Sequence, residues 1–210
     1  MKTFNYKCKV PKFKYYFRHP VEQILFFDIE TTGLSPKASS LYMIGVMFYN
    51  KEDNNWHLIQ FFADNYKSEA DMINSFLDIL ENYNYLYQFN GKRFDIPYIL
   101  NKCDKHGISP SEHSDKILND KSGIYSIDIL AYIRPVKKML NLSKANQTAL
   151  ERWLGIVRDD KFDGGKLIPI YTEYMQKKIL ATSKEDELEK ILFLHNYEDI
   201  ENMLNVASIM

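Results

Sequence analysis

The stretch ILFFDIETTGL, residues 24–34, decides the fold because a short apolar run ends there in two acidic residues. Residues 24–29 have the length and composition of a buried strand. Asp28 and Glu30 are two positions apart, so on a strand both side chains emerge on the same face. The turn-rich TTGLSP follows. The stretch therefore predicts a strand that presents two carboxylates at its carboxyl end, where α/β sheets gather their ligands.

The acidic pair itself has two interpretations. Two like charges at the end of a buried strand repel each other unless a cation neutralises them. Hard divalent cations such as Mg²⁺ take oxygen ligands and provide that neutralisation. The alternative is a pair of solvated acids at the start of a loop. The spacing of Asp28 and Glu30 leaves both interpretations open.

The remaining segments predict a mixed sheet flanked by helices. LYMIGVMFY (41–49) and WHLIQFFA (56–63) complete an antiparallel meander of three strands with the first one. Two further strands are expected at YLYQFN (85–90) and IYSIDIL (124–130). A helix is expected from a capping box at residues 68–71 through Leu80, where apolar residues recur at helical spacing. Further helices are expected over residues 95–106, 143–154, 168–178 and 184–207, the last with a cap at Ser183. Three antiparallel strands followed by strand–helix alternation predict an α/β fold with a five-stranded mixed sheet.

Further acidic residues stand on the predicted helices. Asp95 begins a helix, where Asp is a preferred N-cap, so both capping and metal binding are open. His195 and Asp199 lie one turn apart on an apolar stripe of the last helix. A carboxylate on a buried face is costly unless it is paired or bound to metal, so Asp199 could pair with His195 or be a ligand. Asp128 is the second candidate for the last ligand, with helix capping or loop anchoring as its alternative.

Four motifs in order give the chain a family resemblance. FFDIETTGL (26–34) resembles the first motif of the DnaQ-like, or DEDD, 3′→5′ exonucleases. YQFNGKRFDIPYIL (87–100) resembles their second motif, and HNYEDIENM (195–203) their third. LSKANQTALERWLGIVRDDKFDGG (142–165) is similar to a stretch typical of the YprB-like branch of that superfamily. The resemblance implies that the mixed sheet is of the ribonuclease H-like type.

The first twenty residues lie outside this resemblance. We therefore expect a basic and aromatic N-terminal extension over residues 1–20 and a ribonuclease H-like exonuclease domain over residues 21–210. The extension holds six Lys or Arg residues, no Asp or Glu, and several Phe and Tyr residues. This mixture suits phosphates and bases, and an edge strand with solvated lysines is the alternative.

The resemblance also implies a mechanism and a set of site residues. Two divalent metal ions, Mg²⁺ or Mn²⁺, would be held by Asp28, Glu30, Asp95 and Asp199. His195 would act as general base, or only orient water and Asp199, because a histidine here occupies the position of a tyrosine in one subgroup. The residues expected around the 3′-terminal nucleotide are Thr31, Thr32, Leu34, Asn90, Arg93 and Phe94. Arg93 and Arg158 would contact phosphates unless they are ordinary surface arginines.

Composition excludes several other classes of protein. Cys8 and Cys103 are the only cysteines, without a CxxC pair, so neither a disulfide framework nor a thiolate zinc site is expected. No apolar run approaches the roughly 18 residues of a membrane span, so a cytoplasmic protein without a membrane partner is expected.

The expected function is metal-dependent 3′→5′ hydrolysis of DNA or RNA, with a single-stranded 3′ end as the partner. Two alternatives remain open. One is a catalytically silent nucleic-acid-binding adaptor of the same fold, and the other is a structure-specific endonuclease or resolvase.

Overall fold

Six strands form one sheet in the computed structural model, which describes residues 1–8, 17–65, 67–179 and 185–208. The strands lie in the order β1-β4-β3-β2-β5-β6. Their bounds are Lys2–Lys7 (β1), Ile24–Thr31 (β2), Leu41–Asn50 (β3), Asn55–Phe62 (β4), Tyr85–Gln88 (β5) and Ser126–Asp128 (β6). β1 to β4 are joined by antiparallel pairs, whereas β5 and β6 run parallel to β2. The predicted mixed α/β sheet is therefore confirmed.

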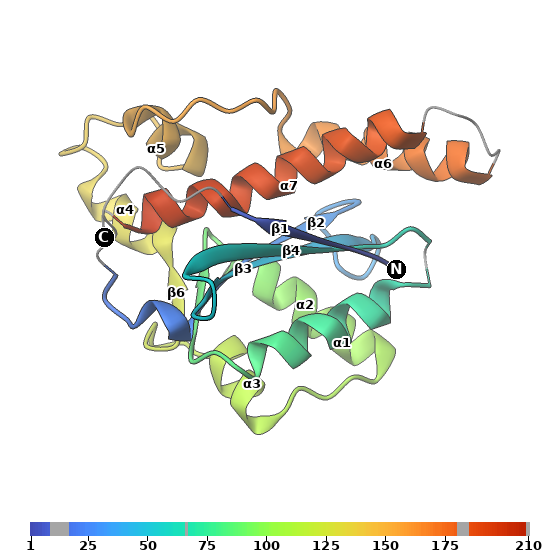
Figure 1. Ribbon diagram of the computed structural model, residues 1–210, viewed down its shortest axis with the longest axis horizontal. Coiled ribbons are helices and arrows are strands. Elements are labelled where there is room, and N and C mark those ends of the chain that lie inside the picture. Colours follow the sequence, from blue (N-terminus) through green and yellow to red (C-terminus); the bar gives the residue numbers. More distant parts are fainter. Residues whose placement is uncertain (9–16, 66, 180–184, 209–210) are drawn as a thin grey trace.

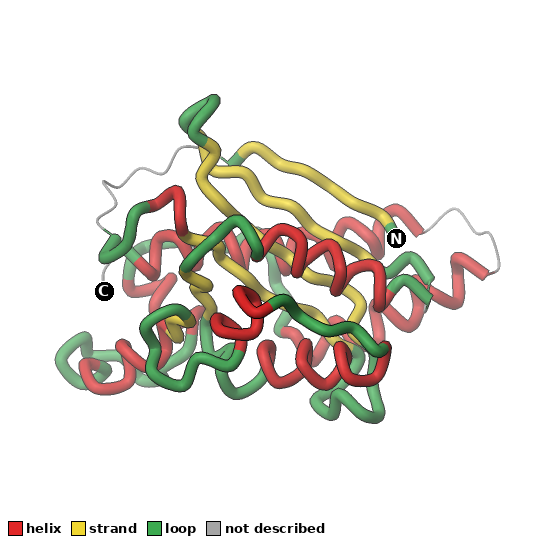
Figure 2. Tube along the Cα trace, turned by 90° about the horizontal axis from the view of Figure 1, so that it is seen from below, coloured by secondary structure: helices red, strands yellow, loops and turns green. Residues whose placement is uncertain are grey.

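Helices cover both faces of this sheet and give the molecule three layers (Figure 1). On one face lie α1 (Glu69–Leu80), α2 (Asp95–His106) and α3 (Glu112–Leu118). On the other lie α4 (Ile129–Val136), α5 (Gln147–Trp153), α6 (Gly164–Ile179) and α7 (Glu185–Ala207). A short 3₁₀ turn, η1 (Val21–Gln23), precedes β2. Seen from the side of α1 to α3, the strands run next to one another behind these helices (Figure 2).

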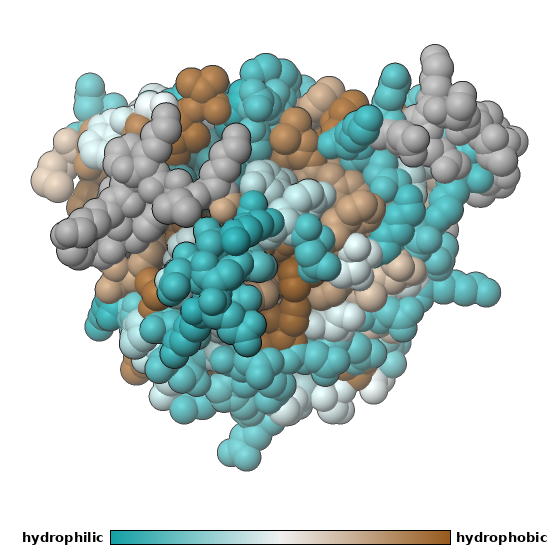
Figure 3. All heavy atoms as spheres, viewed as in Figure 1, coloured by the Kyte–Doolittle hydropathy of each residue, from teal (hydrophilic) through white to brown (hydrophobic). Residues whose placement is uncertain are grey.

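Apolar side chains fill the space on both faces of β2. Phe27 stacks on Phe76 of α1, with ring centroids 4.6 Å apart. Phe26, which points the other way, belongs to the cluster that contains Ile200 and Met203 of α7. The face shown in Figure 3 is largely hydrophilic, with separate hydrophobic patches. Among the described residues, no helix combines the length and apolar character needed to cross a membrane.

The sheet has one strand more than the five predicted, because part of the expected N-terminal extension is its edge strand. β1 pairs with β4 along its whole length. Alternate side chains of β1 pack inward. Phe4 lies 4.4 Å from Phe193 and Tyr6 lies 5.2 Å from Tyr197, measured between ring centroids. These two contacts with α7 hold the strand against the domain.

The lysines of β1 are engaged by acidic residues. Lys2 Nζ lies 2.5 Å from Glu189 Oε2, and Lys7 Nζ lies 3.0 Å from Asp53 Oδ2. For residues 2–7 the structure therefore follows the edge-strand alternative. Residues 9–16, which carry the other lysines of the predicted extension, lie outside the described residues.

The predicted helices are found, but α5 begins at Gln147 rather than at residue 143, and α6 begins at Gly164 rather than at residue 168. The expected strand over residues 124–130 ends at Asp128, because the Asp128 side chain accepts a hydrogen bond from the Leu130 N–H and starts α4. Asn146 caps α5 in the same way. Ser68 precedes α1 but makes no side-chain cap, and Ser183 lies outside the described residues. α3 and α4 are too short to show a helical apolar period and were not predicted.

Candidate metal centre

Asp28 and Glu30 lie on the face of β2 that is turned toward α7. Side chains alternate along a strand, so these acids continue the face of Phe26, which packs with α7. Glu30 is buried and Asp28 is half-buried. β2 is hydrogen-bonded to β3 on one side and to β5 on the other. The acidic pair therefore stands at the carboxyl end of a central, rigid strand.

Gly45 of β3 allows α7 to approach this face closely. It lies opposite Asp28 in the register of β2 and β3. A Cβ atom at Gly45 would lie 2.0 Å from Ile200 Cδ1 and 2.2 Å from Asn196 Oδ1, so only glycine leaves room for the helix. Asn196 Nδ2 donates a hydrogen bond to Asp28 Oδ2 at 2.9 Å, and Gln60 Nε2 donates to Asn196 Oδ1. The close contact thus fixes α7 against Asp28.

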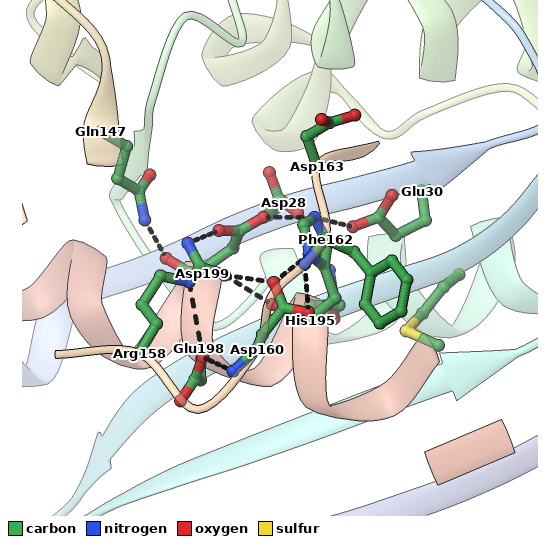
Figure 4. Close-up of polar contacts among 12 residues, drawn as sticks. Asp28, Glu30, Gln147, Arg158, Asp160, Phe162, Asp163, His195, Glu198 and Asp199 are labelled. Atoms are coloured by element: carbon green, nitrogen blue, oxygen red, sulfur yellow. Dashed lines mark hydrogen bonds and ion pairs between the residues drawn. The ribbon is translucent and has the colours of Figure 1, made fainter. Parts of the chain in front are cut away.

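α7 brings His195 and Asp199 to Glu30 (Figure 4). His195 Nε2 lies 3.2 Å from Asp199 Oδ2 and 3.6 Å from Glu30 Oε1. One ligand atom from each of the three residues lies within 4.8 Å of the other two, an arrangement that could hold a metal ion. Asp199 therefore pairs with His195 and also belongs to the cluster formed with Glu30.

Asp95 reaches the same cluster from the first turn of α2. Phe94 is the N-cap residue, and Asp95 is the first residue of the helix. Asp95 Oδ1 accepts a hydrogen bond from the N–H of Ile29, at 3.3 Å. Ile29 stands between the two acids of β2, so this bond ties Asp95 to them. Asp95 is thus a member of the acidic cluster, and Phe94, not Asp95, occupies the cap position.

Burial and mutual repulsion raise the pKa values of three of these acids. Burial is the first cause for each of them. The pKa of Asp28 is raised well above its ordinary value, by burial and then by the charges of the neighbouring carboxylates. The pKa of Glu30 is raised to about 8, although His195 lowers it, and that of Asp95 to about 7. A divalent cation removes this repulsion, so the donor set fits such an ion.

Arg158 is half-buried against Asp199, with 12% of its side chain exposed. Its Nη1 lies 2.5 Å from Asp199 Oδ1. Glu151, Asp160 and Glu198 surround the rest of the guanidinium at 3.4, 3.6 and 3.4 Å. Burial alone would lower the pKa of Arg158, but these carboxylates raise it. Arg158 is therefore not an ordinary surface arginine, because carboxylates surround its guanidinium beside the acidic cluster.

Asp160 holds the opposite side of the His195 ring. Its Oδ2 lies 2.7 Å from His195 Nδ1, so each ring nitrogen has a carboxylate neighbour. Burial alone would lower the pKa of His195, but the charges of the surrounding carboxylates raise it. Glu198 accepts hydrogen bonds from the N–H groups of Asp159 and Asp160 and so fixes this loop on α7. The imidazole is held from both sides.

Three clefts meet at this cluster, and Asp28 lines all of them. The Leu34 cleft, about 280 Å³, is lined by Thr31, Leu34 and Phe94 among others. The Arg134 cleft, about 530 Å³, includes Asn90, Asp95 and Arg134. The third cleft, about 700 Å³, includes Gln147, Arg158 and Phe162. The acidic cluster is therefore reached from more than one direction.

Comparison with known proteins identifies the family. A family model described as the RNase H superfamily matches residues 25–210, which is most of the chain. The chain belongs to the RNase H superfamily. The predicted ribonuclease H-like fold is thus confirmed, and the match takes in the β2 acids, Asp95 and the C-terminal helix.

The chain spans only a small part of the longer proteins to which it is similar. DNA polymerase 1 of Sulfurisphaera ohwakuensis is 39% identical over 59 residues, which cover 28% of this chain and 7% of the polymerase. The family B DNA polymerase of Pyrobaculum calidifontis superposes with a TM-score of 0.63 at 17% identity, over 90% of this chain and 24% of that one. This second likeness shows the fold. A product-bound exonuclease I superposes with a TM-score of 0.46 at 16% identity, over 82% of this chain and 46% of that one.

Most residues predicted for nucleotide contact lie near the acidic cluster of this RNase H superfamily member. Thr31, Phe94 and the strongly exposed Leu34 line one cleft. Asn90, with a left-handed φ of 65°, lines the Arg134 cleft. Thr32 and Arg93 line none of the three. Thr32 Oγ1 instead accepts a hydrogen bond from the Ser40 N–H and closes the loop, and Arg93 is exposed.

The prediction missed the residues that support the cluster from behind. Asn196 and Glu198 are buried on α7, on either side of the stripe that carries His195 and Asp199. Their only signal in the sequence is the number of polar residues around that stripe. Asp128, the second candidate for the last ligand, instead caps α4 and accepts a hydrogen bond from the Asn90 N–H. This is the anchoring role given as its alternative.

Proposed function

We propose that this protein is a metal-dependent 3′→5′ exonuclease that hydrolyses single-stranded DNA or RNA. One observation carries the proposal. Asp28 and Glu30 of β2, Asp95 of α2 and Asp199 of α7 meet at the junction of open clefts, although the chain separates them widely. Carboxylates are brought together in this way, at a cost in repulsion, where cations bind.

These four residues would hold two divalent ions, Mg²⁺ or Mn²⁺. The raised pKa values of Asp28, Glu30 and Asp95 support this assignment, because bound cations would keep all three ionised. When bound, such ions lower the pKa of an attacking water and stabilise the leaving oxygen of a phosphodiester. The four carboxylates then balance the ionic charge, so that the scissile phosphate meets no net repulsion.

The protein's own side chains would position the strand end and move a proton. His195 Nε2 faces the cluster and would take the proton of the attacking water, since Asp160 occupies Nδ1. Leu34 and Phe94 would pack against the 3′-terminal nucleotide, with Thr31 beside them. Asn90 would contact the adjoining sugar from the Arg134 cleft. Within the superfamily we assign the chain to the YprB-like branch, on the motif at residues 150–158 that contains Glu151 and Arg158.

The decisive experiment follows 5′-labelled single-stranded DNA and RNA with purified protein and Mn²⁺ or Mg²⁺. A ladder that shortens from the 3′ end, and its absence with EDTA, is the expected result. Asp28→Asn should abolish the ladder without unfolding the protein, because Asn keeps the size of the side chain but not the charge. The same nucleotides joined into a circular single strand should survive.

The two alternative functions give different results. Cleavage of the circular strand would identify an endonuclease or resolvase. Binding of the linear strand without hydrolysis, under every metal tested, would identify an adaptor that keeps the carboxylates for structural reasons.

A further inference from the structure

Residues 129–150, from the start of α4 into α5, carry cations and no Asp or Glu. The cations are Arg134, Lys137, Lys138 and Lys144. Three of them are exposed, and Lys137 is half-buried. Tyr132, just before Arg134, is 42% exposed, and Met139, between Lys138 and Lys144, is 80% exposed. We name residues 132–144, with these cations and apolar side chains, the α4 strip.

The charges of the α4 strip are not neutralised within the described part of the chain. None of its four cations takes part in an ion pair there. The lysines of β1 differ, because Lys2 pairs with Glu189 and Lys7 pairs with Asp53. A group of unpaired cations on a chain of net charge −1 favours an anionic partner.

The strip begins at the acidic cluster. Arg134 lines one cleft together with Asp28 and Asp95. The start of α4 is fixed to the same place, because Asp128 Oδ1 accepts hydrogen bonds from the N–H groups of Leu130 at 3.1 Å and Asn90 at 2.9 Å. A polymer that leaves the cluster through the Arg134 cleft therefore meets the strip next.

We propose that the α4 strip binds the phosphates of a single-stranded nucleic acid on the 5′ side of the bond that is cut. This inference rests on the proposed exonuclease function. The 3′-terminal nucleotide would lie in the Leu34 cleft, and the rest of the strand would leave past Arg134 toward Lys137 and Lys138.

Binding in the absence of hydrolysis tests the strip directly. A fluorescent oligodeoxythymidylate and an oligouridylate are titrated in Ca²⁺ over a series of salt concentrations, with wild type and Lys137→Ala/Lys138→Ala. Each phosphate contact contributes about 0.7 to the log–log salt slope for single strands, so the double variant should lose about 1.4. The matched control is Lys51→Ala/Lys105→Ala, which removes two exposed lysines from the β3–β4 turn and the last turn of α2. An unchanged slope in the strip variant, with a wild-type melting temperature, would overturn the proposal.

Hydrolysis assays separate this proposal from the exonuclease itself. Lys137→Ala/Lys138→Ala should raise KM for the long oligonucleotide at least about fivefold, since phosphate contacts are lost. It should leave kcat/KM unchanged for the p-nitrophenyl ester of thymidine 5′-monophosphate, because that ester has no upstream phosphates and neither lysine lines a cleft at the acidic cluster. If wild type makes no ladder but the strip variant still loses salt slope, only the exonuclease assignment fails. If the ladder forms, and Lys137→Ala/Lys138→Ala loses binding to phosphatidylserine vesicles but not to oligonucleotides, the strip serves a membrane and the proposal is overturned.

Discussion

Asp160 decides which nitrogen of His195 faces the acidic cluster. With the Asp160 carboxylate 2.7 Å from Nδ1, that nitrogen carries a proton, and Nε2 is turned toward Asp199 and Glu30. An asparagine could instead donate its amide to Nδ1 and so place the proton on Nε2. The ring would then keep its position but lose the free nitrogen that accepts a proton.

We therefore expect Asp160→Asn to lower kcat at least about tenfold, since a general base contributes typically about 10²–10⁴-fold. KM should change little, because Asp160 does not face the nucleotide clefts beside Leu34 or Arg134. The measurement is steady-state hydrolysis of the p-nitrophenyl ester. Asp159→Asn is the control, because it removes a carboxylate from the exposed neighbouring position. Equal kcat for both variants would reduce Asp160 to a packing residue.

Single residues of the site were predictable only where a local motif marks them. Asp28 and Glu30 follow from their spacing on one strand, and Asp95 from its place after the next strand. The contact of His195 with Asp160 joins residues 35 positions apart, and that of Arg158 with Asp199 joins residues 41 apart. No periodicity encodes such tertiary pairs, so the sequence predicts Arg158 only at a phosphate or at the surface.

At the scale of elements, the site depends on how closely α7 packs on β3. Gly45 is the point of contact, and a methyl group there would overlap Ile200 and Asn196. The side chains that would have to move are themselves packed, since Ile200 and Asn196 are both fully buried. The helix must therefore shift as a unit, and it would carry His195 and Asp199 away from Glu30.

Gly45→Ala should destabilise the protein by about 1–3 kcal/mol, the usual cost of overpacking a core. It should also lower hydrolysis more than the loss of folded protein explains. Denaturant unfolding and kcat per folded molecule are the two measurements. Gly164→Ala is the control for stability, because a Cβ atom there meets open space. A Gly45→Ala protein with wild-type stability would show that α7 has room to move.

The elements show the same limit on prediction as the residues. Segments with a clear apolar period, such as α1 and α2, are predicted correctly, and Gly107 ends α2 in the left-handed conformation that favours glycine. The strand expected over residues 124–130 was too long, because the capping side chain of Asp128 ends it early. The sequence does not decide that β1 is a strand, because its basic residues suit an exposed extension as well as an edge.

At the scale of the whole molecule, the clustered acids link stability to pH and to metal. Glu30 has an ordinary pKa of 4.5 that is raised to about 8, and Asp95 one of 3.8 raised to about 7. The pKa values of Asp28 and His195 are raised as well. In each case the folded state holds the proton more tightly than the unfolded state. These groups stabilise the fold fully below the pKa values that they have in the unfolded state. Their stabilisation is lost as pH rises through the pKa values that they have in the folded state.

The melting temperature of the metal-free protein should therefore fall as pH rises from about 5 to about 8. Groups with lowered pKa values act elsewhere, because Asp64 and Glu69, both at about 2, lose their contribution only in acid. Thermal scans in EDTA across this range measure the slope. Glu30→Gln should flatten it and raise the melting temperature at about pH 8, since it removes one buried charge. Glu52→Gln, at an exposed position, should change neither.

Adding Mn²⁺ should reverse the trend, because the ion binds the deprotonated carboxylates and competes with protons for them. At about 100 times its Kd, an ion adds about 2.7 kcal/mol to the free energy of unfolding. That gain should grow with pH in wild type and shrink in Glu30→Gln. The carboxylates repel one another and attract the ion through the same charges. The variant that is more stable in EDTA must therefore be the one that metal stabilises less. Glu30→Gln protein that is destabilised in EDTA and stabilised by Mn²⁺ as fully as wild type would exclude Glu30 from the metal centre.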